Sequence, residues 1–279
     1  MPIRNVKQFR QWQPPYRPDA IIEDGLLLPE TALFMFGSAK SWKTWHSLHL
    51  AYTITSGTPW FGYEVKRATV FRYQVELTEY IDKDRTFGYL KNRTPENLFF
   101  KTPDDNIFLD TTFGKQSLEH DILEVKKRTP YPDEPLVVIL DPIYLLMSGD
   151  PSDGQDTKKV LINLRELRPK HHVTFIIVHH ARLAKTDGQG KEIDMGFEEI
   201  MGSSYWGNFC DTMLRTRLMN PYSGANRTQL SFLLHRNAKH FHPAFITEWD
   251  RNTLVPEVIQ RDIVEDEEAS VRNLIGDEE

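Results

Sequence analysis

The chain has 279 residues, of which 39% are hydrophobic and 11% aromatic, so it can bury the core of a full α/β domain. Its single cysteine, Cys210, excludes an internal disulfide and a cysteine-based zinc site. The formal net charge is −6, but residues 257–279 hold nine acidic and two basic residues, a net charge of −7. The other 256 residues therefore have a net charge of +1. This balance excludes a broad basic surface but leaves local nucleic-acid binding open.

The first 30 residues are rich in proline, arginine and aromatic side chains and have no regular pattern. They could form an arm that packs on a neighbouring subunit, or a lead-in that covers its own domain, and the sequence leaves both interpretations open. The N-terminus lacks a signal-peptide pattern, and no apolar run is long enough to cross a membrane. We therefore expect a cytoplasmic protein without a membrane partner.

Strand-like and helix-like segments alternate from residue 32 to residue 180. The predicted strands cover 32–36, 68–75, 106–110, 136–140 and 173–178, and the predicted helices cover 43–55, 81–93, 116–128 and 155–168, the last stopping before Pro169. This alternation predicts an α/β fold with a mainly parallel sheet and helices on both faces. Three closely spaced strands, 211–218, 227–235 and 243–249, then predict an antiparallel extension at one edge. Residues 257–279 are predicted to be an acidic tail.

The segment between the first strand and the first helix has the spacing of a phosphate-binding loop. Its residues are Gly37, Ser38, Ala39, Lys40, Ser41, Trp42, Lys43 and Thr44, with Trp45 following. In such a loop, backbone N–H groups and a helix N-terminus bind phosphate oxygens, the lysine reaches the β- and γ-phosphates, and the Thr44 hydroxyl holds Mg²⁺. Trp42 departs from the pattern, because it stands where a glycine is expected. The alternative is a polar strand-to-helix turn that contains Lys-Thr by chance.

Polar residues at three further strand ends are candidates for the same site, since parallel strands present their carboxyl ends at one edge. Asp141 follows a continuous apolar run and is predicted to hold Mg²⁺. Glu76 is the candidate base that deprotonates water, unless it merely begins the next helix. His179 and His180 could sense the γ-phosphate; a shared metal is not expected, because adjacent strand residues point to opposite faces.

A basic group, Arg236, Lys239, His240 and His242, lies between the last two predicted strands. It could be a solvated loop, or it could contact nucleic-acid phosphate. A third interpretation is that one of these cations reaches the ATP of a neighbouring subunit and stabilises the transition state.

These motifs, in this order, resemble those of the RepA-type, RecA-like AAA ATPases of plasmids and phages, which include hexameric replicative helicases. The similar segments are residues 37–45, Ser-Gly-Thr-Pro-Trp-Phe-Gly at 56–62, Val75-Glu76 with Arg85, Leu140-Asp141-Pro142, Val178-His179-His180, and Gly202-Ser203-Ser204 followed by Cys210-Asp211-Thr212. Met201 departs from the family pattern, which has arginine there.

The resemblance implies a RecA-like three-layer P-loop NTPase core over residues 31–256, with ATP and Mg²⁺ as ligands. It also implies a homo-oligomer, a hexameric ring that binds ATP between subunits. It places Arg236 and Lys239 where such rings have trans-acting basic fingers. Single-stranded DNA would pass through the ring, contacting a loop at 182–200 through Arg182, Lys185 and Lys191.

The sequence therefore favours an ATP-hydrolysing motor of DNA replication, a ring helicase. Two alternatives stay open at this stage. One is a DNA-associated ATPase of recombination or replication that does not unwind. The other is a nucleotide-binding regulatory protein with little turnover, which the substitution at Trp42 would favour.

Overall fold

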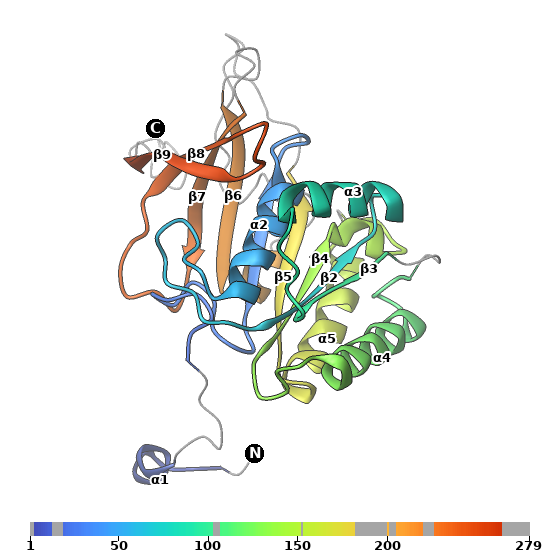
Figure 1. Ribbon diagram of the computed structural model, residues 1–279. Helices are drawn as coiled ribbons and strands as arrows, with labels where there is room; N and C mark the ends of the chain where they lie inside the picture. The colour runs from blue at the N-terminus through green and yellow to red at the C-terminus, as the bar shows by residue number, and fades with distance from the viewer. Residues whose placement is uncertain are drawn as a thin grey trace, which may run out of the picture.

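A mixed sheet forms the centre of the computed structural model, which describes residues 3–12, 19–102, 107–151, 153–181, 200, 205–219 and 226–263 (Figure 1). The strand order of this nine-stranded sheet is β3-β2-β4-β5-β1-β6-β7-β8-β9. The strands are β1 (Ala32–Gly37), β2 (Thr69–Gln74), β3 (Leu98–Lys101), β4 (Leu136–Asp141), β5 (Val173–His180), β6 (Thr212–Met219), β7 (Arg227–His235), β8 (Ala244–Trp249) and β9 (Pro256–Ile263). Neighbours from β3 to β6 pair in parallel, and β6 to β9 pair antiparallel.

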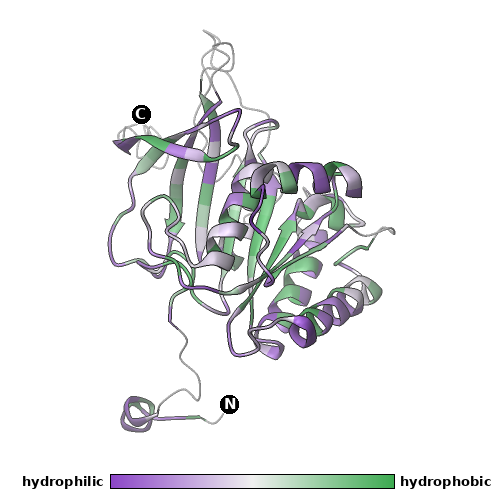
Figure 2. Ribbon diagram, in the orientation of Figure 1, coloured by the Kyte–Doolittle hydropathy of each residue, from purple (hydrophilic) through white to green (hydrophobic). Residues whose placement is uncertain are grey.

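Helices cover both faces of the sheet, which gives three layers. They are α1 (Val6–Gln11), α2 (Lys43–Ser56), α3 (Glu79–Leu90), α4 (Thr112–Arg128), α5 (Gly154–Lys170) and α6 (Tyr205–Phe209), with a 3-10 turn η1 (Ile143–Leu146). Alternate residues of β1 face opposite layers: Leu33 and Met35 pack in one core with α2, and Phe34 and Phe36 pack in the other with α4, α5 and α6. Figure 2 shows this pattern as apolar strands at the centre and polar outer helix faces.

The predicted α/β architecture, mainly parallel with an antiparallel C-terminal edge, is confirmed. One strand prediction was wrong: residues 107–110 form a loop, although Ile107 and Leu109 are buried. The Leu109 N–H donates to the carbonyl of Leu146 and not to a neighbouring strand. The edge strand beside β2 is β3. Short apolar runs of this kind are ambiguous, since a buried loop and a strand can have the same composition.

Three further differences concern the end of a helix, the direction of a strand and an additional strand. Helix α5 continues past Pro169 to Lys170, and the proline lies in the last turn, where it removes only one helical hydrogen bond. Strand β6 is parallel to β1, so the antiparallel extension begins with β7 rather than β6. Strand β9 occupies residues that the sequence analysis had assigned to the acidic tail, and it closes the sheet edge beside β8.

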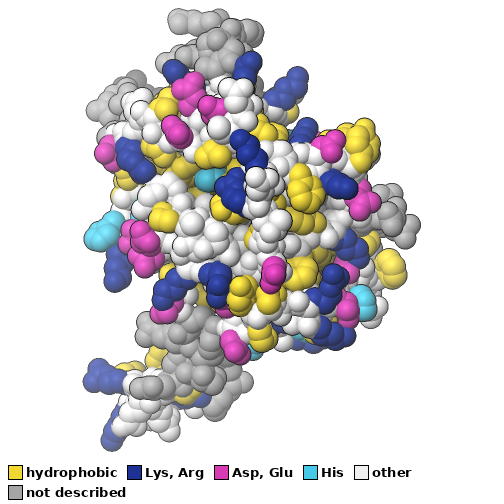
Figure 3. Space-filling model, in the orientation of Figure 1, with side chains coloured by type: hydrophobic (Ala, Val, Ile, Leu, Met, Phe, Trp, Pro, Cys, Tyr) yellow, Lys and Arg dark blue, Asp and Glu magenta, His cyan; other side chains and the backbone are white. Residues whose placement is uncertain are grey.

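Two surface features bear on the predicted partners. Helix α1 has no buried residue, and Figure 1 shows it apart from the sheet. On the face shown in Figure 3, lysine and arginine side chains are interspersed with aspartate and glutamate instead of forming one broad patch. Among the described helices, none has the length and apolar character needed to cross a membrane.

Candidate nucleotide-binding site

The loop after β1 is held against β6 at Gly37. This residue pairs with Thr216 of β6 on one side and His180 of β5 on the other. A Cβ atom on Gly37 would lie 2.1 Å from the carbonyl oxygen of Thr216 and 2.4 Å from its Oγ1. No side chain fits there, so glycine is required by the close approach of β6 rather than by a positive φ.

Two serines shape the rest of the loop. The fully buried Ser41 hydroxyl donates to the carbonyl of Ser38 at 2.8 Å and shares a hydrogen bond of 2.9 Å with the Thr216 hydroxyl. These bonds fold residues 38–41 into a tight turn beside the end of β1. The turn leads into α2, whose N-terminus therefore points toward the space enclosed by the loop.

Trp42 is the N-cap of α2 and has left-handed backbone angles, φ 63° and ψ 17°. This conformation favours glycine and is strained for a bulky residue. The indole stacks on Trp249 of β8, with ring centroids 5.5 Å apart and planes 21° apart, and its ring centroid lies 6.1 Å from that of Trp45. Aromatic packing between α2 and β8 thus offsets the backbone strain that the missing glycine creates.

This balance predicts an unusual order of stability for two variants of Trp42. Trp42→Ala loses the stacking but keeps the strained backbone, so we expect the free energy of unfolding to fall by about 1–3 kcal/mol. Trp42→Gly loses the same stacking but relieves the strain, so it should be about 1 kcal/mol more stable than the alanine variant. Urea unfolding of the three proteins measures this order. An alanine variant at least as stable as the glycine variant would contradict it.

Lys43 lies inside the loop and is 6% exposed. Its Nζ donates to the carbonyl oxygens of Gly37 at 2.9 Å and Ser38 at 2.6 Å. Burial lowers its pKa to about 8, an effect that the negative charges of Asp141 and Glu76 partly oppose. The ammonium group is therefore held by loop carbonyls and lies near two carboxylates, in the region where phosphate oxygens would bind.

Asp141 ends β4 and is 1% exposed. Its Oδ1 accepts a long hydrogen bond, 3.4 Å, from the Thr44 hydroxyl, and its Oδ2 accepts a bond of 2.8 Å from the Ser47 hydroxyl. A hydroxyl and a carboxylate are hard oxygen donors of the kind that Mg²⁺ prefers, and Mg²⁺ takes its remaining ligands from water and phosphate. The Thr44 hydroxyl and the Asp141 carboxylate are therefore the protein groups here that could hold Mg²⁺.

Glu76 is exposed and lies beyond the end of β2, where its N–H donates to the side chain of Gln74 at 2.7 Å. Strand pairing places Gln74 directly opposite Asp141. Helix α3 begins at Glu79 after its N-cap Thr78, so Glu79, and not Glu76, has the position of a helix-starting carboxylate. The negative charge of Glu76 acts on both Lys43 and Tyr144. The pKa of Tyr144 is raised mainly by burial and to a smaller extent by Glu76.

The adjacent histidines of β5 have different surroundings. His179 is fully buried and packs against Phe34 and Trp206, at ring distances of 5.7 and 5.5 Å. His180 is half-buried, lies 5.0 Å from the Tyr144 ring, and has a pKa lowered to about 4 by burial and then by the charge of Lys43. At neutral pH, His180 is therefore an uncharged hydrogen-bonding group on the loop side, whereas His179 belongs to the core.

Residues 4–185 of the sequence match the family of AAA domains. The chain belongs to this family. None of the curated proteins searched matches the sequence.

Solved structures resemble this AAA domain in fold. An ATPase domain has a TM-score of 0.64 at 9% identity and covers 88% of this chain and 93% of its own. A KaiC-like protein, PH0186, from the hyperthermophilic archaeon Pyrococcus horikoshii OT3 has a TM-score of 0.53 at 14% identity and covers 85% and 93%. A DnaB-like replicative helicase, solved for its interactions with primase, has a TM-score of 0.61 at 9% identity and covers 82% and 59%. The protein is thus a RecA-like AAA ATPase.

Two of the predicted catalytic cations lie at the opposite ends of the strands from the phosphate-binding loop. Arg236 and Lys239 follow β7, whose last residue, His235, pairs with Thr212 at the start of β6, whereas the phosphate-binding loop lies near the end of β6. The Arg236 guanidinium donates to the carbonyls of Gly207 at 2.8 Å and Asn208 at 3.3 Å. Within one chain neither cation belongs to the site, and a role at a neighbour's ATP stays a prediction.

The predicted nucleic-acid contacts Arg182, Lys185 and Lys191 lie outside the described residues. Conversely, the site contains side chains that were not predicted from the sequence: Ser47, Arg72, Tyr144 and Thr216. Two of them had a signal. Ser47 follows Thr44 by about one helical turn, and Arg72 is the only charged residue of β2. The contacts of Tyr144 and Thr216 depend on tertiary structure alone.

Proposed function

We propose that the protein is an ATP-hydrolysing motor that translocates on single-stranded DNA as a ring helicase of DNA replication. The observation that carries the proposal is the meeting of Lys43, the Thr44–Asp141 pair and Glu76 at the carboxyl edge of the parallel strands. Sheet edges of this kind bind nucleotides in open α/β folds. The similarity in fold to a DnaB-like replicative helicase supports the choice of motor, and the motifs of the sequence support it independently.

Each residue has a distinct task in this proposal. Lys43 and the N–H groups of the loop bind the ATP phosphates, Thr44 and Asp141 hold Mg²⁺, and bound Mg²⁺ would neutralise phosphate charge. Glu76, which is exposed beside the loop, orients and deprotonates the attacking water. His180 is neutral and can donate a hydrogen bond toward the γ-phosphate side of the site.

The remaining parts of the motor require more than one chain. Arg236 or Lys239 would supply a positive charge to the ATP of a neighbour in a hexameric ring, where such a charge is worth orders of magnitude in rate. Arg182, Lys185 and Lys191 would contact DNA phosphates inside the ring. Within one chain Arg236 donates to the carbonyls of Gly207 and Asn208, so its contact with ATP would have to be made in a neighbouring subunit.

The test is ATP turnover with and without single-stranded DNA, at low salt with Mg²⁺, together with strand separation on a forked duplex. We expect single-stranded DNA to raise turnover severalfold, and blunt duplex DNA, the control, to have little effect. Stimulation without unwinding would instead support a DNA-associated ATPase that does not unwind. If neither stimulation nor unwinding occurs, the motor proposal fails.

A further inference from the structure

Arg72 is a buried cation that connects the candidate metal carboxylate to helix α3. It lies in β2, and its side chain is 1% exposed. Its Nη1 donates to Asp82 of α3 at 2.6 Å, and its Nη2 contacts Asp141 Oδ2 at 3.4 Å. Strand register explains the contact with Asp141: Arg72 lies opposite Ile139, and Asp141 follows two residues later on the same face of β4.

The two carboxylates differ in how closely they hold the guanidinium. The bond to Asp82 has the length of a strong charge-assisted hydrogen bond, whereas the contact with Asp141 is 0.8 Å longer (3.4 against 2.6 Å). Since the attraction between charges falls with distance, the guanidinium is attracted more strongly to Asp82 than to Asp141. Asp141 therefore does not form a close ion pair with Arg72, and its Oδ1 faces the Thr44 hydroxyl.

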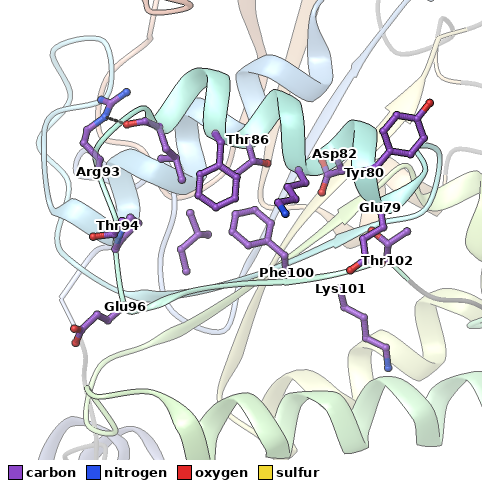
Figure 4. A pocket seen from close by; sticks show the side chains of 15 residues that line it. Glu79, Tyr80, Asp82, Thr86, Arg93, Thr94, Glu96, Phe100, Lys101 and Thr102 are labelled. Carbon is purple, nitrogen blue, oxygen red and sulfur yellow. Dashed lines mark hydrogen bonds between the residues drawn. The ribbon is translucent and has the colours of Figure 1, made fainter.

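Asp82 also borders a groove between α3 and β3, with a volume of about 910 Å³ (Figure 4). Thr86 and Phe100 line the same groove, and none of the loop residues 37–45 does. The partner that holds Arg72 away from Asp141 is thus on an element outside the loop. A change in the position of α3 would therefore move the guanidinium of Arg72 relative to Asp141.

We propose that Arg72 and Asp82 are positioning residues that together set how strongly Asp141 attracts Mg²⁺. Asp82 holds the guanidinium back, so that it does not form a closed ion pair with Asp141. Arg72 in turn offsets the charge of Asp141, which would otherwise repel the ATP phosphates when Mg²⁺ is scarce. This inference rests on the proposed function, because it takes Asp141 as the Mg²⁺ ligand of a nucleotide site.

The two positioning residues should have opposite effects when they are replaced. In Asp82→Asn, the guanidinium is free to pair fully with Asp141, and Mg²⁺ must displace it. The Mg²⁺ concentration for half-saturation should therefore rise about tenfold, with nucleotide binding in EDTA unchanged or tighter. In Arg72→Met, Asp141 loses the guanidinium and keeps only Lys43 as a nearby cation: binding in EDTA should weaken about tenfold, and the Mg²⁺ half-saturation should fall.

The experiment measures binding of a fluorescent ATP analogue to the full chain, first in EDTA and then along a Mg²⁺ titration. Arg67→Met is the matched control, because Arg67 is 46% exposed and pairs with Glu134 at the surface, away from the site. Arg72→Lys keeps the charge and should restore binding in EDTA. If Arg72→Met fails to fold, the Asp82→Asn titration decides alone, since asparagine keeps the size of the side chain.

Several outcomes would overturn the inference. Mg²⁺ curves of Asp82→Asn and Arg72→Met that coincide with the wild-type curve, or shift in the same direction, would show that the pair has only a structural role. A wild-type protein whose affinity for the analogue does not change along the Mg²⁺ titration would also overturn it. If the wild type does not bind the analogue at all, the proposed function fails first and the inference falls with it.

Discussion

Replacing Lys43 by alanine is expected to lower ATP turnover at least a thousandfold, about 4 kcal/mol of transition-state stabilisation. The ammonium group lies inside the loop, 2.9 Å from the carbonyl oxygen of Gly37 and 2.6 Å from that of Ser38. In a phosphate-binding loop this charge is positioned for the β- and γ-phosphates, where negative charge develops on the leaving oxygen in the transition state. Phosphate release is measured in the presence of Mg²⁺, at a protein concentration at which the chain assembles. It gives the ratio of wild-type to variant turnover.

The control for this variant is Lys127→Ala, which removes the same charge from the surface of α4. Lys127 is 71% exposed and pairs with Glu124, so its loss should change turnover by less than about twofold. Unfolding by urea should show that the Lys43 variant is folded. Turnover within tenfold of wild type in a folded Lys43→Ala protein would show that the loop does not bind the phosphates.

The parts of the site that could be predicted are those that one strand end specifies by itself. The phosphate-binding loop has a fixed spacing, and the apolar run of β4 leads directly to Asp141, so both are visible in the sequence. Parallel pairing then brings the ends of β1, β2, β4 and β5 to one edge. Because parallel strands share their direction, predicting the strands was enough to predict that these residues meet.

What could not be predicted depends on strand order and on packing between distant segments. The sequence gives no register for β6, so neither the contact of Gly37 with Thr216 nor the distance of Arg236 from the loop could be inferred. Trp42 is similar: its deviation from glycine was visible, but its stacking partner, Trp249, is 207 residues away. The strand predicted at 106–110 was wrong because Ile107 and Leu109 are buried although they lie in a loop.

The replacement of Glu76 by glutamine is expected to separate binding from hydrolysis. Glutamine keeps the size of the side chain but cannot accept a proton, so turnover should fall by about 10²- to 10⁴-fold. Nucleotide affinity should change little, because Glu76 is exposed beside the loop and is not one of the residues that hold Lys43 or Asp141 by hydrogen bonds. Single-turnover phosphate release and binding of a fluorescent ATP analogue measure the two effects separately.

Glu79→Gln is the matched control, because Glu79 carries the same charge three residues later but belongs to the first turn of α3. It should retain turnover within about twofold of wild type, since a carboxylate at a helix N-terminus contributes mainly to helix stability. Equal losses in both variants would mean that the charge of this segment matters, and not a base at Glu76. If wild-type turnover is negligible and Glu76→Gln leaves it unchanged while ATP still binds, the site holds nucleotide without hydrolysing it. In that case the substitution at Trp42 would be explained by a regulatory role in which ATP is bound and not hydrolysed. The proposal of a motor would then be wrong.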